Sequence, residues 1–304
     1  MKKIFITGIS LFLIYNYVII KIASFAQAKD SEANIVNAQE YLYNFPNKKY
    51  VIVGSSMAKF IPNNNISDGF YNLSIVAGSI YTGLEIIKHE KSELPSVIFV
   101  ETNLINTLYD SDFVDNLFVP FIKDIKSFFP SLQRKYKFIL LVDNYIPDWL
   151  LVKLFGKIAI VSGLYSENPI SLANKDNVIK EKKDFFKNET IHYNNHFIDE
   201  KDKKNMESNI NKINDYIRYF TKKNIKIVLF EIPTDTAIHY GEKMNYKRDL
   251  LDSIIKDKNI LFFKDADAKK YSKYIKDGVH LNSEGSQIYL DYLKKKLIEN
   301  NVLL

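Results

Sequence analysis

Residues 50–56 read YVIVGSS, an apolar run rich in β-branched residues that ends at Gly54 and is followed by two serines. A short apolar run bounded by a glycine is typical of a buried strand that leads into a turn. Comparable runs recur along the chain, at 70–76 (FYNLSIV), 96–102 (SVIFVET), 225–233 (IKIVLFEIP) and 260–267 (ILFFKDAD). Because these runs are nearly continuous in hydrophobicity rather than alternating, they predict strands of a parallel sheet that is covered on both faces.

Amphipathic segments separate these runs and predict helices. They lie at 79–92, 205–224, 247–258 and 282–301. In the second of them, apolar residues recur at helical spacing with charged residues opposite: Met206, Ile210, Ile213, Ile217 and Phe220. The alternation of strand and helix predicts a three-layer α/β/α domain.

Residues from about 105 to 204 interrupt this alternation and are too many for a simple crossover. Within them, 118–129 (FVPFIKDIKSFF) predicts a helix, 137–163 is strongly apolar and contains Trp149, and 174–190 is charged. Two interpretations of the apolar part remain open, either additional core or a lid or membrane-facing surface near the substrate. We therefore expect residues 29–304 to form one catalytic domain with an insertion at about 105–204.

The N-terminus predicts attachment to, or passage through, a membrane. Lys2 and Lys3 precede an almost entirely apolar stretch, residues 4–20, which as a helix would reach roughly 26 Å, near the lower limit for a bilayer span. Positive charge before the apolar run keeps the N-terminus in the cytoplasm. The AQA at 26–28 also fits a signal-peptide cleavage site, and a buried helix is a third interpretation. We expect residues 1–28 to be a signal anchor or signal peptide. The body would then lie on the extracytoplasmic face (periplasm or cell surface), or be secreted after cleavage.

The composition excludes several classes of site. The net charge of +6 is a mild excess that is not concentrated in one stripe, so we expect no nucleic-acid binding. The chain has no cysteine, which excludes disulfides, thiolate metal sites and a cysteine nucleophile. His192 and His196 have a metal-like i, i+4 spacing, but the two asparagines between them weaken a helix and no carboxylate motif stands nearby. We therefore expect no metal and no cofactor.

Polar residues follow three of the predicted strands. Ser55 and Ser56 follow the first strand, Gly78 lies just after the second, and Asn103 follows the third. The carboxyl ends of the strands form the ligand-binding edge of an open parallel sheet, so these residues are expected to share one edge. A serine there becomes a nucleophile only when a base accepts its proton.

The best candidate for that base is His280, one of five histidines, which stands in KDGVHLNSEG (276–285). Asp277 lies three residues before it. In a turn that leads into a helix, this spacing lets the carboxylate accept a hydrogen bond from the imidazole Nδ1–H and leaves Nε2 free to accept a serine proton. Asn282 or Ser283 is expected to cap the helix that follows.

Four blocks of sequence together resemble the SGNH/GDSL hydrolase superfamily, in the order found in that family. They are VGSSM (53–57), NLSIVAGS (72–79), VETNLIN (100–106) and DGVHLNSEG (277–285). The resemblance implies a flavodoxin-like parallel sheet of about five strands. It covers roughly 50–110 and 220–300 and leaves the insertion unexplained.

The resemblance also implies roles for the matching residues. Ser56 takes the place of the nucleophile, and His280 and Asp277 complete a triad with it. The oxyanion would be bound by backbone N–H groups and one side chain, from Ser56, from Ala77 or Gly78, and from Asn103.

Four positions depart from the common family pattern. Ser55 stands where many members have Asp, and the strict second-block position falls on Ala77, next to Gly78. Glu101 and Leu104 stand where the commonest third block has Gly and Asp. Such variants are similar to membrane-attached members that modify surface polymers, including the alginate-acetylation and DltD-like groups.

These features predict an extracytoplasmic, membrane-anchored serine esterase or O-acyltransferase. Its expected substrates are acyl esters of cell-envelope polysaccharide, and its membrane contact is the N-terminal helix. Two alternatives remain open. One is a non-catalytic envelope protein that binds glycan or a partner through an SGNH fold. The other is a DltD-like acyl relay that works only with a membrane acyl-transfer partner.

Overall fold

The computed structural model describes residues 2–23, 30–45, 48–62, 68–90, 94–105, 109–137, 198–255, 260–264, 266–275 and 277–302. The chain divides into two compact units, one of Met1–Tyr43 with Leu117–Lys180 and the other of Asn44–Asn116 with Glu181–Leu304. Most of the predicted insertion, with Trp149, His192 and His196, lies outside the described residues.

The second unit is built on a five-stranded parallel sheet, which confirms the predicted fold class. All five apolar runs form strands, and they are ordered β2-β1-β3-β4-β5, the flavodoxin-like order. In the register of the sheet, Ile52 of β1 lies between Asn72 of β2 and Phe99 of β3. The strands are β1 (Tyr50–Val53), β2 (Phe70–Asn72), β3 (Val97–Glu101), β4 (Lys226–Phe230) and β5 (Leu261–Phe263).

The four predicted helices of this unit are confirmed, with small shifts at their ends. They are α4 (Ile80–His89), α10 (Glu200–Thr221), α12 (Glu242–Ile255) and α14 (Ser283–Glu299). The Asn282 side chain caps α14 by accepting a hydrogen bond from Gly285 N–H, as the sequence predicted. Short helices that the sequence did not predict lie in the connections: α3 (Ser56–Lys59), α5 (Ser111–Leu117), α11 (Thr236–His239), α13 (Ala268–Tyr271) and the 3₁₀ helix η6 (Ser272–Tyr274).

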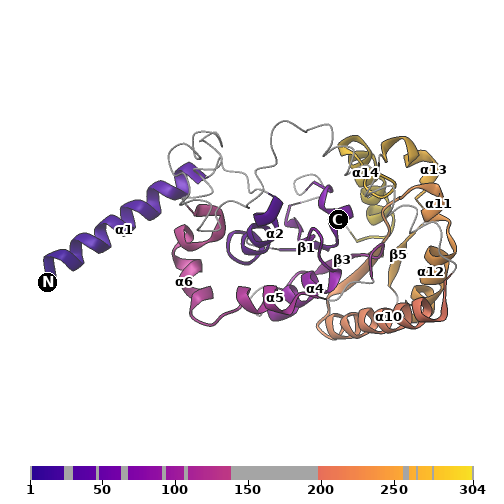
Figure 1. Ribbon diagram of the computed structural model, residues 1–304, viewed down its shortest axis with the longest axis horizontal. Coiled ribbons are helices and arrows are strands. Elements are labelled where there is room, and N and C mark those ends of the chain that lie inside the picture. Colours follow the sequence, from indigo (N-terminus) through magenta and orange to yellow (C-terminus); the bar gives the residue numbers. More distant parts are fainter. Residues whose placement is uncertain are drawn as a thin grey trace, which may run out of the picture. The chain divides into compact units, whose positions relative to one another are not determined.

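Helices cover both faces of the sheet, and the strands lie between α14 and α10 in Figure 1. On one face, a buried cluster joins α14 residues such as Leu290 and Leu293 to Ile52, Phe99 and Phe230 of the strands. On the other face, α4 lies so close to β1 that a Cβ on Gly83 would sit 2.9 Å from Val53 Cγ1. Burial on both faces explains why the strand sequences are continuously apolar.

The first unit contains the N-terminal helix α1 (Lys2–Ala23) and the helix predicted at 118–129, which is α6 (Ile122–Phe128). Lys2–Lys21 of α1 is long and apolar enough to cross a membrane, and most of its side chains are exposed. The remaining described elements of this unit are α2 (Asp30–Gln39), most of the π-helical turn η1 (Glu40–Asn44), and the 3₁₀ helices η3 (Pro130–Leu132) and η4 (Arg134–Tyr136).

Replacing Gly285 by alanine should destabilise the protein, although alanine is the better helix former by about 1 kcal/mol. A Cβ at Gly285 would lie 2.6 Å from Tyr274 Cβ, so the first turn of α14 has to move away from η6. We expect Gly285→Ala to cost about 1–3 kcal/mol of unfolding free energy in urea unfolding of the full chain. Glu284→Ala, an exposed change in the same turn, is the control. Equal or higher stability of Gly285→Ala would contradict this packing.

Candidate active site

Ser56 follows β1 as the first residue of α3 and is partly exposed. The turn before it is tight, because a Cβ on Gly54 would lie 2.5 Å from Ala58 Cβ, and only glycine fits there without a shift. Ser55 caps α3, its Oγ accepting a hydrogen bond from Met57 N–H at 3.2 Å. The strand, the glycine and the cap together place the Ser56 side chain at the carboxyl edge of the sheet.

Three side chains predicted from the sequence form one hydrogen-bonded chain. Ser56 Oγ lies 2.9 Å from His280 Nε2. His280 Nδ1 lies 2.7 Å from Asp277 Oδ2 on the other side of the ring. If His280 carries its proton on Nδ1, the Nδ1–H donates a hydrogen bond to the Asp277 carboxylate. Nε2 then accepts a hydrogen bond from the Ser56 hydroxyl. This arrangement suits proton transfer from Ser56 to His280.

The loop that carries Asp277 is shaped to hold it ionised. Gly278 has φ 89°, and Asp277 Oδ1 accepts hydrogen bonds from the backbone N–H groups of Val279 and His280. Partial burial works to raise the pKa of the Asp277 carboxyl, but the hydrogen bonds from His280 and Val279 outweigh it and lower the pKa to about 2. Asp277 is therefore a carboxylate at neutral pH, which favours a protonated His280 during a reaction.

Ser55 differs from Ser56 because its hydroxyl already donates a hydrogen bond to a buried carboxylate. Both the N–H and the Oγ of Ser55 donate hydrogen bonds to Glu101 Oε2, each at 2.7 Å, and Ser55 is only 1% exposed. Ser55 and Glu101 are two of the positions that depart from the family pattern, and the structure brings them into contact. Burial raises the pKa of Glu101, while the hydrogen bonds from Ser55 and the charge of Lys247 act to lower it.

Besides Ser56, the residues predicted to bind an oxyanion are Ala77 and Gly78, which follow β2, and Asn103, which follows β3. Ala77 is exposed and has φ 53°, a backbone conformation that glycine adopts more readily. The Gly78 N–H donates to Ile75 O at 3.2 Å, whereas the Ala77 N–H has no acceptor among the described residues. An oxyanion role for either residue stays a prediction.

Asn103 is held in place by the backbone of the segment that follows β4. Its Oδ1 accepts a hydrogen bond from Ile232 N–H, and its Nδ2 donates to Ile232 O, both at 2.8 Å. An amide nitrogen carries two N–H donors. One is used at Ile232, so the other is the donor that an oxyanion role would require.

The segment after β4, residues 231–240, is a part of the site that sequence reasoning missed. Besides fixing Asn103, it binds the loop that carries Asp277, since Asp235 N–H donates to Gly278 O at 2.9 Å. The available signal was Glu231, a charged residue directly after the apolar run of β4.

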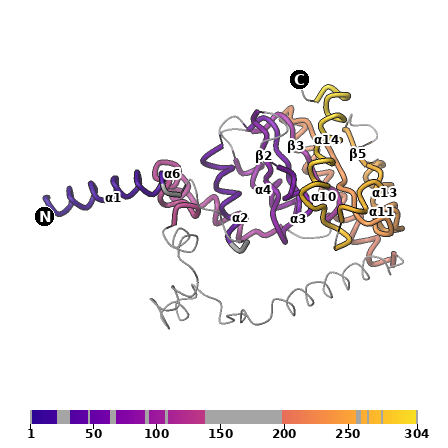
Figure 2. Tube along the Cα trace, turned by 90° about the horizontal axis from the view of Figure 1, so that it is seen from above, coloured from indigo at the N-terminus to yellow at the C-terminus, as the bar shows by residue number. Residues whose placement is uncertain are grey.

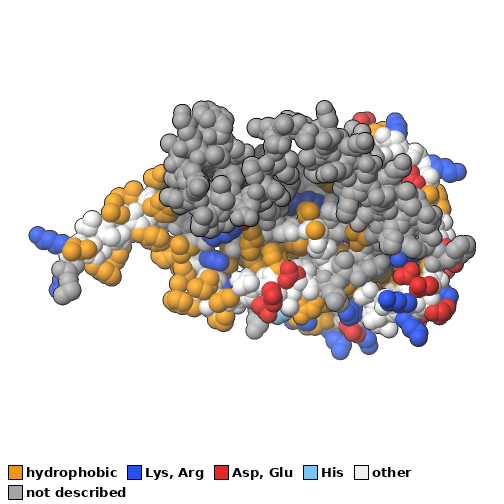
Figure 3. All heavy atoms as spheres, viewed as in Figure 1, with side chains coloured by type: hydrophobic (Ala, Val, Ile, Leu, Met, Phe, Trp, Pro, Cys, Tyr) orange, Lys and Arg blue, Asp and Glu red, His pale blue; other side chains and the backbone are white. Residues whose placement is uncertain are grey.

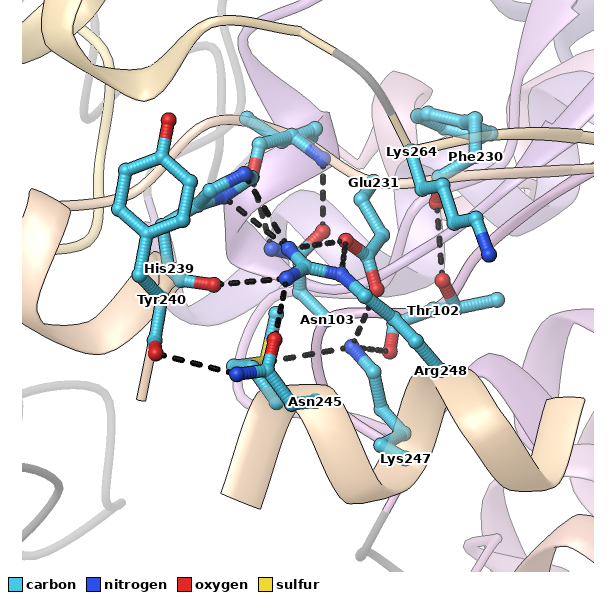
Figure 4. Close-up of polar contacts among 12 residues, drawn as sticks. Thr102, Asn103, Phe230, Glu231, His239, Tyr240, Asn245, Lys247, Arg248 and Lys264 are labelled. Atoms are coloured by element: carbon cyan, nitrogen blue, oxygen red, sulfur yellow. Dashed lines mark hydrogen bonds and ion pairs between the residues drawn. The ribbon is translucent and has the colours of Figure 1, made fainter. Parts of the chain in front are cut away.

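A buried ionic cluster anchors this segment (Figure 4). Glu231 lies 2.9 Å from Lys247 Nζ and 2.7 Å from Arg248 Nη2. Lys247 also donates to Thr102 O, and Arg248 donates to His239 O. Burial alone would raise the pKa of Glu231, but the two cations outweigh it and lower that pKa. A charge buried in this way is expensive unless each partner stays in place, so the cluster fixes the ends of β3 and β4 to α12.

His239 is buried against this cluster, where its ring packs beside Arg248. It is 3% exposed, and its Nε2 lies 3.2 Å from Arg248 Nη2. Burial, followed by the Arg248 charge, lowers the pKa of His239 to about 4.

Comparison with known proteins adds little to this geometry. No protein family and no curated protein matches the sequence. Among solved structures, a crystal structure of a "putative acylhydrolase" from Bacteroides fragilis NCTC 9343 is similar, with a TM-score of 0.44 and 12% sequence identity over 90% of this chain and 99% of that one. At that TM-score the likeness carries no argument, so the assignments that follow rest on the residues of this chain.

Removing the Ser55 hydroxyl should mainly cost stability. Ser55→Ala leaves buried Glu101 with one hydrogen bond fewer and α3 without its cap, and we expect a loss of about 1–3 kcal/mol in urea unfolding. Glu101→Gln tests the other partner, since Gln keeps an acceptor oxygen for Ser55. A Ser55→Ala chain as stable as the parent would contradict this role.

The stability of the protein should fall as the pH drops from about 6.5 to about 4 because of His239. The pKa of His239 is about 4 in the folded protein and 6.5, the ordinary value for histidine, in the unfolded chain. The unfolded chain therefore binds the proton first and is favoured as the pH falls through this window. His239→Gln removes this titration and should flatten the decline, measured by urea unfolding across the window. An unchanged slope in the variant would contradict the assigned shift.

Proposed function

We propose that the protein is a serine-dependent acyl-ester enzyme of the SGNH/GDSL type, anchored in a membrane with its catalytic unit on the extracytoplasmic side. The observation that carries the proposal is the chain of contacts from Ser56 Oγ to His280 to Asp277, at 2.9 and 2.7 Å. A serine outside a catalytic site has no need of a histidine whose second nitrogen is held by an ionised carboxylate.

The reaction begins when Ser56 Oγ attacks the carbonyl carbon of an acyl ester and its proton passes to His280 Nε2. Asp277 holds the ring and stabilises the imidazolium that forms. The negative oxygen of the tetrahedral intermediate accepts hydrogen bonds from the N–H groups of Ser56 and Ala77 and from the Asn103 amide. Each such donor typically contributes about 2.7–4 kcal/mol to lowering the barrier.

Collapse of the intermediate breaks the ester C–O bond, and the leaving alcohol takes the proton from His280. The acyl group is then bound to Ser56 as an ester. In the second half, water or a sugar hydroxyl loses its proton to His280 and attacks the acyl carbon, which frees Ser56 and yields an acid or a new ester. The enzyme is an esterase in the first case and an O-acyltransferase in the second.

We propose acyl esters of cell-envelope polysaccharide as the substrate class, whether water or a sugar hydroxyl accepts the acyl group. The support is the candidate membrane span Lys2–Lys21 together with Lys2 and Lys3 at its start, which favour an extracytoplasmic body. An anchored enzyme on that side meets esters of envelope glycans.

Turnover of a chromogenic acetate ester by the full chain in detergent tests the proposal. Ser56→Ala and His280→Ala should each lower kcat/KM by about three orders of magnitude or more, because members of a triad act as a unit. The matched controls are Ser253→Ala and His89→Ala, both on exposed residues, which should retain parental rates. Equal rates in all five chains would remove the triad.

If the parent chain does not turn over the ester, two further results separate the two alternatives. Glycan binding that survives alanine at Ser56, Asp277 and His280 would favour a non-catalytic binding protein. Activity that appears only with a membrane acyl-transfer partner, and is lost in Ser56→Ala, would favour an acyl relay.

A further inference from the structure

Apolar side chains are exposed together on the segment that contains α6 in the first unit. Their exposed fractions reach 70% for Phe121 and 81% for Phe128, and Val119, Ile122 and Leu132 are exposed as well. We name these five residues the α6 surface. Figure 3 shows apolar side chains gathered over α1 and α6. Contiguous exposed apolar side chains of this kind mark a binding surface.

The α6 surface adjoins the candidate membrane span. Phe12 and Phe129 rings meet edge to face with centroids 5.2 Å apart, and Ser131 N–H donates to Asn16 Oδ1 at 3.0 Å. Ile19 is 3% exposed and packs against Tyr136. Figure 2 shows α6 beside the C-terminal end of α1. All of these contacts lie within one compact unit.

These contacts make α1 part of the folded unit. A signal peptide is removed, and its removal here would leave Phe129, Ser131 and Tyr136 without their partners on α1. Asn16 is a polar residue in an apolar helix, and its bond to the Ser131 backbone gives it a place in that unit. The packing therefore favours a retained anchor over a cleaved signal.

We propose that α1 is retained and that the α6 surface binds the lipid bilayer beside it, at the boundary of headgroups and acyl chains in the extracytoplasmic leaflet. With Lys2 and Lys3 in the cytoplasm, Asn16 lies roughly 8 Å below the outer end of a span that finishes at Lys21. An interfacial helix buries its apolar face about 5–10 Å into that boundary, and the contact at Asn16 lies within that depth. The Phe129 ring, which meets Phe12, reaches deeper, to roughly 14 Å below the same end.

The sequence of the segment fits the same surface. Apolar residues 121, 122, 125, 128 and 129 recur at helical spacing, and the polar residues 123, 124, 126 and 127 separate them. Arg134 and Lys135 are ion-paired with Glu32 and Glu40. The other basic residues between 119 and 137 are Lys123, Lys126 and Lys137, and they exceed the single acidic residue, Asp124, which favours anionic headgroups. Phe121 itself has φ 65°, a strained conformation for a bulky side chain, and such strain is found where a residue is held for a function.

The absence of cysteine permits a direct test with single-cysteine variants of the full chain in vesicles of phosphatidylcholine and phosphatidylglycerol. A polarity-sensitive fluorophore is attached at Phe128→Cys or Ile122→Cys. Leu13→Cys on exposed α1 is the lipid reference, and Ser253→Cys on α12 is the aqueous reference. We expect the α6 probes to emit at shorter wavelength than the probe at 253 and to be quenched severalfold more by spin-labelled lipid.

Two outcomes would overturn the bilayer as the occupant. Probes at 122 and 128 that behave like the probe at 253 would mean that the surface faces water. Probes shielded from aqueous iodide but insensitive to spin-labelled lipid would mean that a protein covers it. The intact mass of the chain recovered from membranes tests retention: we expect residues 2–28 to be present, and a chain that begins at residue 29 would overturn the proposal. None of these readouts depends on ester turnover.

Discussion

The hydrogen bond between Ser56 Oγ and His280 Nε2 joins residues that are 224 positions apart in the sequence. It forms because β1 lies inside a parallel sheet, with its carboxyl end at the edge where the loop before α14 also lies. In the order β2-β1-β3, the next two strands along the chain lie on opposite sides of β1, which makes β1 the topological switch point of the sheet. Ligands of open α/β sheets bind at such a point. The rest of the site is arranged around that position.

Two buried carboxylates support this edge without belonging to the triad. Glu101 ends β3 and fixes the turn of Ser55, and Glu231 follows β4 and is held by Lys247 and Arg248. Each lies at the end of an apolar strand, where its ion pairs or hydrogen bonds fix a loop. Through Ile232 and Asp235, the second carboxylate also fixes Asn103 and the loop that carries Asp277. The site is therefore a set of loops tied together by buried polar groups.

The fold and the contact between Asp277 and His280 were predictable from the sequence because both depend on local pattern. Continuous apolar runs predicted the five strands, and the spacing of Asp277 and His280 predicted their contact. The contact between Glu101 and Ser55 was not predictable, because it depends on the register between β1 and β3. The resemblance to the SGNH/GDSL pattern indicated only that both residues depart from it. The Glu231 cluster was missed for a similar reason, since Lys247 and Arg248 are ordinary helix residues until α12 is placed beside β4. The α6 surface was predicted as a helix, but its exposure and its packing against α1 depend on tertiary structure.

The central claim is that Ser56, activated by His280, forms an acyl-enzyme. The most direct measurement is labelling of the full chain with a fluorophosphonate, followed by peptide mass spectrometry of the modified serine. The account predicts modification at Ser56 in the parent chain and loss of modification in His280→Ala, because the hydroxyl then has no base. Modification at Ser55, or at Ser56 with equal rate in both chains, would contradict it.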